Sequence, residues 1–459
     1  MKKCHFVIAS LFFYAASFCS CANIKIKKID KSYIENIPRV ILGDEQSEKY
    51  LPLLKDKRVA LFSNHSGIMG DKIILQDGRE LFGGNELYGS SEEAADLPFG
   101  KDADGNDISY GPHILDFLIE SGVNVTAIFC PEHGFRGTED AGAGINNSVD
   151  EKTGVPLLSL YSGGSDKMPP ASDMATFDTL VVDIQDVGLR YYTYYISLYH
   201  LMKACALYGK KVIILDRPNP NGFYVDGGIL QKDFESNVGL LAMPTVHGMT
   251  LGELARMLND SKLLDKDWKP CDLTVIPCKN YTHKTKYCLI RRPSPNIRTM
   301  RSVYLYASTC YFENTIVSVG RGTDSPFEIF GSPYFKDDDK MDFSFIPHSI
   351  DGAKNPPFLE EICYGKDLRS IPLSKIFENG SDLSYLSRAY RTAKKMQLTD
   401  FFGKPNSKGY YWIDLLTGSD FVRTQLMKGK YPEEIKESWQ KELDEFKKAR
   451  KPYLLYQEK

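Results

Sequence analysis

FCPEHGFRGTED, residues 129–140, is the stretch around which the rest of the chain is organised. It begins as the end of an apolar strand and turns at Pro131. The turn then presents a set of charged and polar side chains: Glu132, His133, Arg136, Glu139 and Asp140. In an open α/β fold, ligands bind at the carboxyl ends of the strands. The stretch therefore predicts a catalytic role for Glu132, against the simpler interpretation of a polar turn held by its own side chains.

Other apolar runs of strand type occur at 58–63 (RVALFS), 123–130, 179–183 (TLVVD), 211–215 (KVIIL), 273–277 and 303–309. Residues with helical spacing lie between several of them, at 113–121, 194–208 and 251–259. The last of these helices begins with a capping box formed by Thr250 and Glu253. Strands that alternate with helices in this way predict right-handed crossovers and a parallel sheet.

The character of the sequence changes near residue 333. An acidic stretch at 336–342 and a proline-rich stretch at 355–358 precede amphipathic helices at 384–398 and 433–451. We therefore predict an α/β protein in which residues 23–332 form a Rossmann-like parallel-sheet domain. Residues 333–459 are predicted to form a second, smaller α/β domain.

Residues 1–22 are predicted to be a targeting leader. Lys2 and Lys3 precede an apolar run at 6–18 that is too short to span a bilayer and is typical of a secretory signal. Ser20 before Cys21 resembles a bacterial lipobox, which would leave Cys21 lipidated, while Ser20-Cys21-Ala22 also fits an ordinary cleavage site. We predict an exported protein, periplasmic or in the outer membrane, and favour a lipid anchor at Cys21.

Composition excludes several classes of function. The formal net charge of -3 gives no electrostatic basis for binding nucleic acid. The cysteines that follow the leader contain no C-x-x-C pair, so neither a zinc site nor a dense disulfide framework is predicted, although one bridge among Cys271, Cys278 and Cys288 stays open. His65, His133 and His247 lack tight spacing, so no metal is predicted. The glycine fingerprints of nucleotide-binding loops and the G-x-S-x-G elbow of hydrolases do not occur either.

Four strand ends carry polar clusters, which share a position after an apolar run: Asn64-His65, Glu132-His133, Asp183 with Asp186 and Arg190, and Asp216-Arg217 with Asn219 and Asn221. Because parallel strands end at one edge of a sheet, these clusters can converge on a single cleft. Carboxylates, amides, arginine and tyrosine in one cleft suit a ligand rich in hydroxyl groups, such as a sugar.

Glycosidic hydrolysis requires one protonated carboxyl group and usually a second carboxylate as base or nucleophile. Glu132 is the predicted acid, and the candidates for the second role are Asp183, Asp186 and Glu139. The sequence leaves retention and inversion open, since these depend on whether the two groups lie about 5 Å or about 7–9 Å apart. One or two of Tyr191, Tyr192 and Tyr194 are predicted to face the cleft. Arg190, Arg217 and Arg321 are candidates for binding a carboxylate.

Several longer motifs occur in a fixed order: PEHGFRG, DIQDVGLRYYTYY, LDRPNPNG, HGMTLGELA, PSPN and GRGTDSPFE. In this order they closely resemble the NamZ (YbbC-like) family of exo-β-N-acetylmuramidases, over nearly all of the chain after the leader. The resemblance implies a Rossmann-like domain beside a smaller C-terminal domain. It also implies removal of N-acetylmuramic acid from the non-reducing end of peptidoglycan fragments without a metal or organic cofactor.

The family's motif glutamate falls on Glu132, and Arg321 or Arg190 is the hypothesis for contacting the lactyl carboxylate of muramic acid. The predicted substrate-binding residues come from the same motifs: Asn64, His65, His133, Arg136, Glu139, Arg190, Tyr191, Tyr194, Arg217, Asn219, His247, Asn296, Arg321 and Thr323. Two positions differ from the family's usual S-E-G-R-G-T and E-G-T, namely Val319 and Asn314.

Two rival hypotheses stand beside the glycosidase. The first is a surface lipoprotein that binds glycan without cleaving it, which the loss of a carboxylate at Val319 favours. The second is a nucleotide-dependent α/β enzyme, which the missing glycine fingerprint disfavours.

Overall fold

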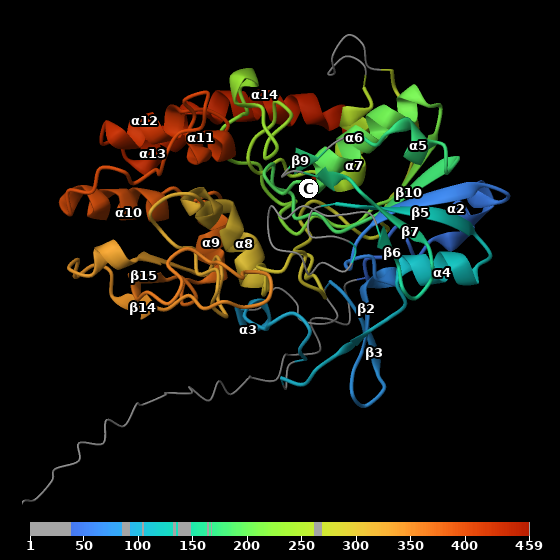
Figure 1. Ribbon diagram of the computed structural model, residues 1–459, viewed down its shortest axis with the longest axis horizontal. Helices are drawn as coiled ribbons and strands as arrows, with labels where there is room; N and C mark the ends of the chain where they lie inside the picture. The colour runs from blue at the N-terminus through green and yellow to red at the C-terminus, as the bar shows by residue number, and fades with distance from the viewer. Residues whose placement is uncertain are drawn as a thin grey trace, which may run out of the picture.

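The computed structural model describes residues 38–84, 92–102, 105–131, 135, 148–162, 165–166, 168–260 and 269–458. In this part of the chain a seven-stranded sheet has the order β12-β11-β10-β1-β5-β7-β6 (Figure 1). Its strands are β1 (Arg58–Ser63), β5 (Asn124–Cys130), β6 (Ser148–Val149), β7 (Pro156–Ser159), β10 (Thr179–Asp183), β11 (Lys211–Leu215) and β12 (Asp272–Ile276). Neighbouring strands are parallel except for β6, which runs antiparallel to β7. The predicted parallel sheet is confirmed.

Helices cover both faces of the sheet, which explains why its central strands are almost wholly apolar. Ala60 and Phe62 of β1 belong to the core that includes α6 (Tyr194–Leu207) and α7 (Leu251–Leu258). The alternate residues of β1 belong to the core under α2 (Ser47–Leu54) and α4 (Ile114–Glu120). Figure 1 shows these helix pairs on opposite sides of the sheet.

The chain builds the sheet outward from β1 in both directions. Strands β5 and β7 follow on one side, and β10, β11 and β12 follow on the other. The order therefore reverses between β1 and β10, where Ser63 pairs with Asp183 at the carboxyl ends. Open α/β sheets bind their ligands outside such a reversal.

Between β1 and β5 the chain forms a small antiparallel sheet of β3, β2 and β4. The short elements that lie between the strands of the main sheet in the sequence are β2 (Lys72–Ile74), β3 (Glu80–Phe82), β4 (Ser109–Tyr110), α3 (Glu92–Ala95), α5 (Ala171–Met174), β8 (Tyr161–Ser162) and β9 (Ser165–Asp166). Of these, α3 packs against α8 (Met300–Thr309) of the C-terminal region. Figure 1 shows the β2–β3 hairpin projecting from the body of the protein.

The C-terminal region, coloured yellow to red in Figure 1, combines helices with an antiparallel sheet of order β13-β15-β14. Its elements are α8 (Met300–Thr309), β13 (Ile329–Ser332), β14 (Phe343–Phe345), β15 (Cys363–Asp367), α9 (Leu373–Asn379), α10 (Ser384–Lys395), α11 (Trp412–Thr417), α12 (Phe421–Met427), α13 (Pro432–Ser438) and α14 (Gln440–Arg450). The hydrophobic core runs without interruption from the main sheet into these helices.

Two sequence expectations about these elements are wrong. The run at 303–309 is not a strand but lies in α8, which begins with a capping box between Thr299 and Ser302. Every residue of α8 is buried, so the helix has no polar face and its sequence looks like a buried strand. The single helix expected at 433–451 is two helices, α13 and α14, which meet at Trp439.

The C-terminal segment returns to the edge of the main sheet. Tyr456 donates its hydroxyl to Asp216 at 2.5 Å and accepts from the backbone N–H of Cys278 at 2.9 Å. The backbone N–H of Leu455 donates to Glu253 of α7 at 2.8 Å. The end of the described chain therefore completes the surroundings of β11 and α7.

All seven cysteines in the described residues are buried and free. The bridge left open among Cys271, Cys278 and Cys288 is therefore not formed. Burial alone accounts for these residues, because cysteine packs like a small hydrophobic side chain.

Candidate active site

A buried ion cluster occupies the end of β10 and β11. Arg217 donates to both carboxylate oxygens of Asp183, at 2.5 and 3.0 Å, and to Asp71 and Asp44 at 2.8 Å each. The side chain of Arg217 is 1% exposed. Tyr287 donates to the remaining oxygen of Asp71 at 2.8 Å. We call Asp44, Asp71, Asp183 and Arg217 the closed cluster, since its guanidinium has carboxylate partners on every side.

The closed cluster places two predicted site residues, Asp183 and Arg217, away from the walls of the cavities described below. Burial raises the pKa of Asp44 and of Asp71, and the Arg217 guanidinium opposes that rise. An arginine held by three buried carboxylates joins segments that are far apart in the sequence. The geometry therefore gives Asp183 and Arg217 a structural role.

Asp186 has a different environment on the loop that follows β10. Its Oδ1 accepts from the backbone N–H of Gly188 at 2.6 Å, whereas its buried Oδ2 has no hydrogen-bond partner among the described residues. Burial raises the pKa of Asp186 to about 7, against the opposing effect of the backbone donors. A carboxyl group that holds its proton near neutral pH is suited to general acid or base chemistry.

Three other predicted site residues support the loops instead of lining a cavity. Arg190 is fully buried and donates to the carbonyls of Gly228, Met243 and Leu416, at 2.8, 2.5 and 2.9 Å. Asn219 donates to the carbonyl of Met249 at 2.8 Å. His247 accepts from the N–H of Met249 at 3.2 Å, and burial lowers its pKa to about 3, so its ring is neutral.

Asn64 and His65 link the end of β1 to the loop before α8. The side-chain amide of Asn64 donates to the hydroxyl of Tyr194 at 2.9 Å, and its Oδ1 accepts from the backbone N–H of Ser66. His65 donates through Nε2 to the carbonyl of Arg292 at 2.8 Å. These bonds fix the strand end beside the tyrosine segment.

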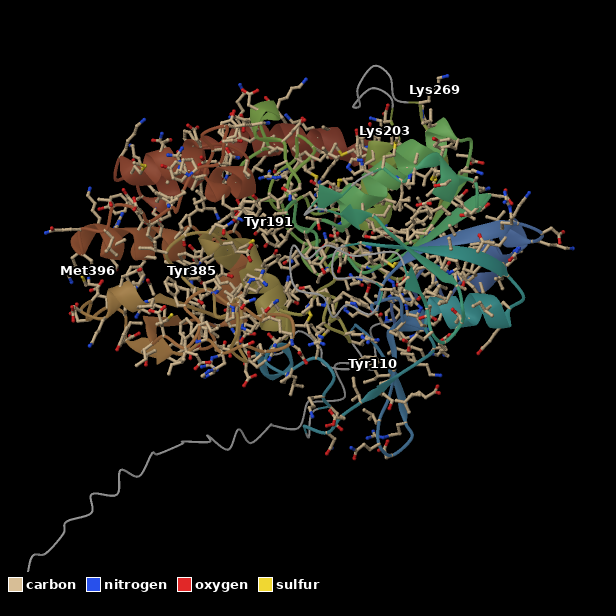
Figure 2. All side chains as sticks on the ribbon, viewed as in Figure 1. Tyr110, Tyr191, Lys203, Lys269, Tyr385 and Met396 are labelled. Atoms are coloured by element: carbon tan, nitrogen blue, oxygen red, sulfur yellow. The ribbon has the colours of Figure 1, made fainter. Side chains whose placement is uncertain are left out.

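The tyrosine segment lies at the centre of the molecule, where Figure 2 labels Tyr191 between the main sheet and the C-terminal helices. Tyr191 donates to the carbonyl of Tyr306 at 3.0 Å, and Tyr192 and Tyr194 donate to the carbonyl of Pro293 at 2.7 and 3.1 Å. All three tyrosines line one large cavity. Because their hydroxyls are bound to backbone, the cavity wall is rigid.

This cavity has a volume of about 870 Å³ and lies between the two regions of the protein. Its polar wall includes Asn296, whose side-chain amide donates to the carbonyl of Gly352 at 2.8 Å. It also includes Arg321 and Glu313, which form an ion pair at 2.5 Å. We call Arg321 and Glu313 the open pair, since their side chains are 20% and 23% exposed.

Arg321 is placed to bind an anion. Its Nε and Nη2 both donate to the same oxygen of Glu313, at 3.1 and 2.5 Å, and the guanidinium lies over the ring of Phe327 at 5.1 Å. Val319, which is 3% exposed, lines the same cavity where the sequence pattern would place a second carboxylate. Glu313 already balances the charge of the guanidinium, but it occupies only Nε and Nη2, so the Nη1 side can meet a planar carboxylate on a ligand. Thr323 lies outside the cavity wall and caps its own turn by accepting from the N–H of Ser325 at 3.1 Å.

Two smaller hollows occur besides the large cavity. One, of about 350 Å³, is lined by His65, His113, Phe135 and Arg291 among others. The other, of about 740 Å³, shares Asn237, Asn314 and Trp412 with the large cavity. Trp412 and Tyr306 were not predicted as site residues. Trp412 belongs to none of the motifs, and Tyr306 lies in the run 303–309 that was predicted to be a strand.

Four further predicted site residues lie outside the described residues: Glu132, His133, Arg136 and Glu139. Phe135, which lies between them in the sequence, packs edge-to-face on the ring of His113 with centroids 5.1 Å apart. No group of three or more His, Cys, Asp or Glu side chains in the described part of the chain is arranged so that it could hold a metal ion. None of the helices described there has the length and apolar character needed to cross a membrane.

Comparison with known proteins gives consistent matches over both regions. Residues 106–301 match the family described as exo-beta-N-acetylmuramidase NamZ, N-terminal, and residues 304–456 match its C-terminal counterpart. Peptidoglycan beta-N-acetylmuramidase NamZ of Bacillus subtilis (strain 168) is 36% identical over 356 residues, which cover 74% of this chain and 82% of that protein.

Two crystal structures of DUF1343 family proteins from Bacteroides fragilis NCTC 9343 share the fold. The first is 44% identical, has a TM-score of 0.73, and is matched over 92% of this chain and 99% of its own. The second is 24% identical, has a TM-score of 0.65, and is matched over 92% of this chain and all of its own. The two family regions meet between residues 301 and 304, within α8.

Proposed function

The chain belongs to the NamZ family of exo-β-N-acetylmuramidases and is a glycoside hydrolase, and we propose that it releases N-acetylmuramic acid from the non-reducing end of peptidoglycan fragments. The observation that carries this proposal is the large cavity between the two regions. It combines tyrosine rings, an asparagine amide and a partly exposed arginine in one space. N-acetylmuramic acid presents an apolar ring face, hydroxyl groups and one lactyl carboxylate, which match these three features in turn.

We propose Glu132 as the general acid. It follows Pro131 directly in the sequence, and Pro131 follows β5 at the carboxyl edge of the sheet. In this role Glu132 transfers its proton to the glycosidic oxygen as the bond from that oxygen to the anomeric carbon breaks. Water supplies the hydroxyl group that the released sugar gains.

Asp186 is the favoured candidate for the second carboxyl group. Asp183 is bound on both oxygens by Arg217, whereas Asp186 keeps one buried oxygen without a partner among the described residues. In its ionised form Asp186 either accepts a proton from the attacking water or attacks the anomeric carbon itself. Glu139 stays a third candidate from the sequence.

The proposal is tested with a chromogenic β-N-acetylmuramide and with peptidoglycan fragments that end in N-acetylmuramic acid. Glu132→Gln should lower kcat at least a thousandfold without changing the unfolding midpoint, because the substitution removes only the transferable proton. Glu361→Gln, a change at an exposed glutamate away from the cavities, is the matched control. Full turnover by the Glu132→Gln protein would remove Glu132 from the mechanism.

The anomer of the released sugar distinguishes the two routes for the second carboxyl group. Proton NMR of the first product, recorded before mutarotation, shows either retention or inversion. Retention assigns the second carboxyl group as a nucleophile, and inversion assigns it as a base. Asp186→Asn should lower kcat far more than it changes KM in either case.

We also propose that the protein is exported and anchored through Cys21. The support is the sequence of residues 1–22, which lie outside the described residues. Labelling of cells with a radioactive or clickable fatty acid, followed by comparison with a Cys21→Ala variant, tests the anchor. Soluble, unlabelled protein from the wild-type gene would contradict it.

A further inference from the structure

The large cavity shares part of its lining with a second groove of about 740 Å³. Asn237, Asn314 and Trp412 line both spaces, so they form the junction. The two spaces therefore make one cleft that runs from the tyrosine segment at the sheet edge to the loop 404–410. Each space alone falls within the range of about 300–1,000 Å³ that is usual for a ligand pocket.

The groove is walled by two segments held in fixed conformations. In the loop 404–410, Asn406 accepts from the N–H groups of Lys408 and Tyr410 at 2.9 and 3.1 Å. Its own N–H donates to the carbonyl of Tyr410 at 2.8 Å. Phe234, which is not part of the groove wall, packs at a tilt against Tyr410, with ring centroids 4.5 Å apart. The ring of Tyr410 is thus preorganised at the side of the groove.

The junction is equally constrained. Asn314 has a φ of 58°, and Gly403 has a φ of 71°. A Cβ added at Gly403 would lie 2.3 Å from the carbonyl oxygen of Asn314, so the two backbones approach each other as closely as a glycine permits. This contact fixes the loop 404–410 against the mouth of the large cavity.

The chemistry of the groove suits a chain of sugars. Tyr410 and Trp412 supply aromatic surface, and the indole N–H of Trp412 has no acceptor among the described residues, so the ring is held by packing. Lys404 and Lys408 line the groove together with Asp233 and Glu235, which leaves its charge balanced. Aromatic faces with both donors and acceptors around them recognise hydroxyl-rich rings without a preference for one charge.

Resting on the proposed function, we infer that the groove binds the sugars on the leaving-group side of the scissile bond, so that the preferred substrate is a glycan chain of four or more sugars. The large cavity takes the terminal N-acetylmuramic acid, and the groove takes the residues that follow it. The groove is a binding site and takes no part in the chemical step. The enzyme therefore favours long chain ends over disaccharides.

The test compares kcat/KM for a peptide-free tetrasaccharide and a disaccharide, both ending in N-acetylmuramic acid. The wild-type ratio should be about three- to tenfold, which is what one aromatic contact to a sugar supplies. Tyr410→Ala should reduce the ratio to about 1. Tyr410→Leu, which keeps apolar packing on Phe234, should do the same and covers the case in which the alanine protein is unstable. Tyr334→Ala, which removes an exposed aromatic ring outside both spaces, should keep the wild-type ratio.

Three outcomes would overturn the inference. These are a wild-type ratio of 1, an unchanged ratio in both Tyr410 variants, and a gain seen only when the tetrasaccharide carries its stem peptides, which would place peptide in the groove. If the folded wild-type protein releases no sugar from any substrate, the proposed function fails by itself. Calorimetry then tests whether the groove binds sugars. A tetrasaccharide should still bind about three- to tenfold more tightly than a disaccharide, and only when Tyr410 is present.

Discussion

Two arginines of this protein sit among carboxylates and have opposite consequences. Arg217 of the closed cluster is 1% exposed and is bound to Asp44, Asp71 and Asp183, so no donor points toward a ligand. Arg321 of the open pair is 20% exposed and has Glu313 as its ion-pair partner. Both residues are arginines, and each lies within one of the long motifs of the sequence, LDRPNPNG or GRGTDSPFE. Exposure and the number of carboxylate partners decide which arginine supports the fold and which meets a substrate.

The largest expected effect is on the closed cluster. Arg217→Met should lower the free energy of unfolding by about 3–5 kcal/mol, because three buried carboxylates lose their counter-charge. Urea denaturation followed by circular dichroism measures the loss. Arg79→Met, at a surface pair whose side chains are 65% and 53% exposed, should change the stability by less than about 1 kcal/mol. An equal loss of the free energy of unfolding in the two variants would contradict the distinction between the closed cluster and a surface ion pair.

The second effect is on binding by the open pair. Arg321→Met should lower kcat/KM for an N-acetylmuramide by about 10- to 100-fold, equivalent to about 1.5–3 kcal/mol for a hydrogen bond to a charged group. The unfolding midpoint should change little. Arg321→Lys should fall between the two proteins, since it keeps the charge but not the planar fork. An unaltered preference for N-acetylmuramide over N-acetylglucosaminide in Arg321→Met would contradict the assignment.

Asp186, on the loop after β10, makes the stability of the protein depend on pH. Its pKa in the folded protein is raised from 3.8 to about 7, so the protonated form favours folding. That stabilisation is complete below the unfolded pKa and is lost as the pH rises through about 7. Between pH 5 and pH 7 the loss is about 2 kcal/mol. Asp186→Asn should flatten the stability profile over this range, and parallel profiles in urea titrations would contradict the burial argument.

The smallest effect is at Glu313. Glu313→Gln keeps one hydrogen bond to Arg321 but removes the charge, and because the pair is partly exposed the stability should fall by no more than about 1 kcal/mol. KM for an N-acetylmuramide should change by a few fold, and more at low than at high salt. A salt-independent KM in both proteins would show that charge at the open pair does not matter for the substrate.

The fold was largely predictable from the sequence, because its central strands are short apolar runs between recognisable helices. Strands β1, β10 and β11 have the predicted bounds. Helix α8 was mistaken for a strand because it is buried on all sides, and the short β7 was missed because it begins with Pro156.

The candidate site was less predictable for a physical reason. The sequence places polar residues at the strand ends, but Asp44 and Asp71 approach Arg217 from segments more than a hundred residues away in the chain. No local motif shows that Arg217, the partner of Asp183, also binds these two carboxylates. In the same way, Trp412 reaches the cavity from a helix that begins far beyond the other lining residues.

The return of the C-terminal segment affects how this protein is made. Asp216 and Glu253 come from the region of the main sheet, yet their partners Tyr456 and Leu455 are synthesised more than 200 residues later. Until those residues are made, the main sheet lacks these hydrogen bonds. The buried carboxylates of Asp216 and Glu253 then each lack one of their partners. Domains usually fold one after another during translation. Here the first cannot reach its final state until residues 455 and 456 have left the ribosome.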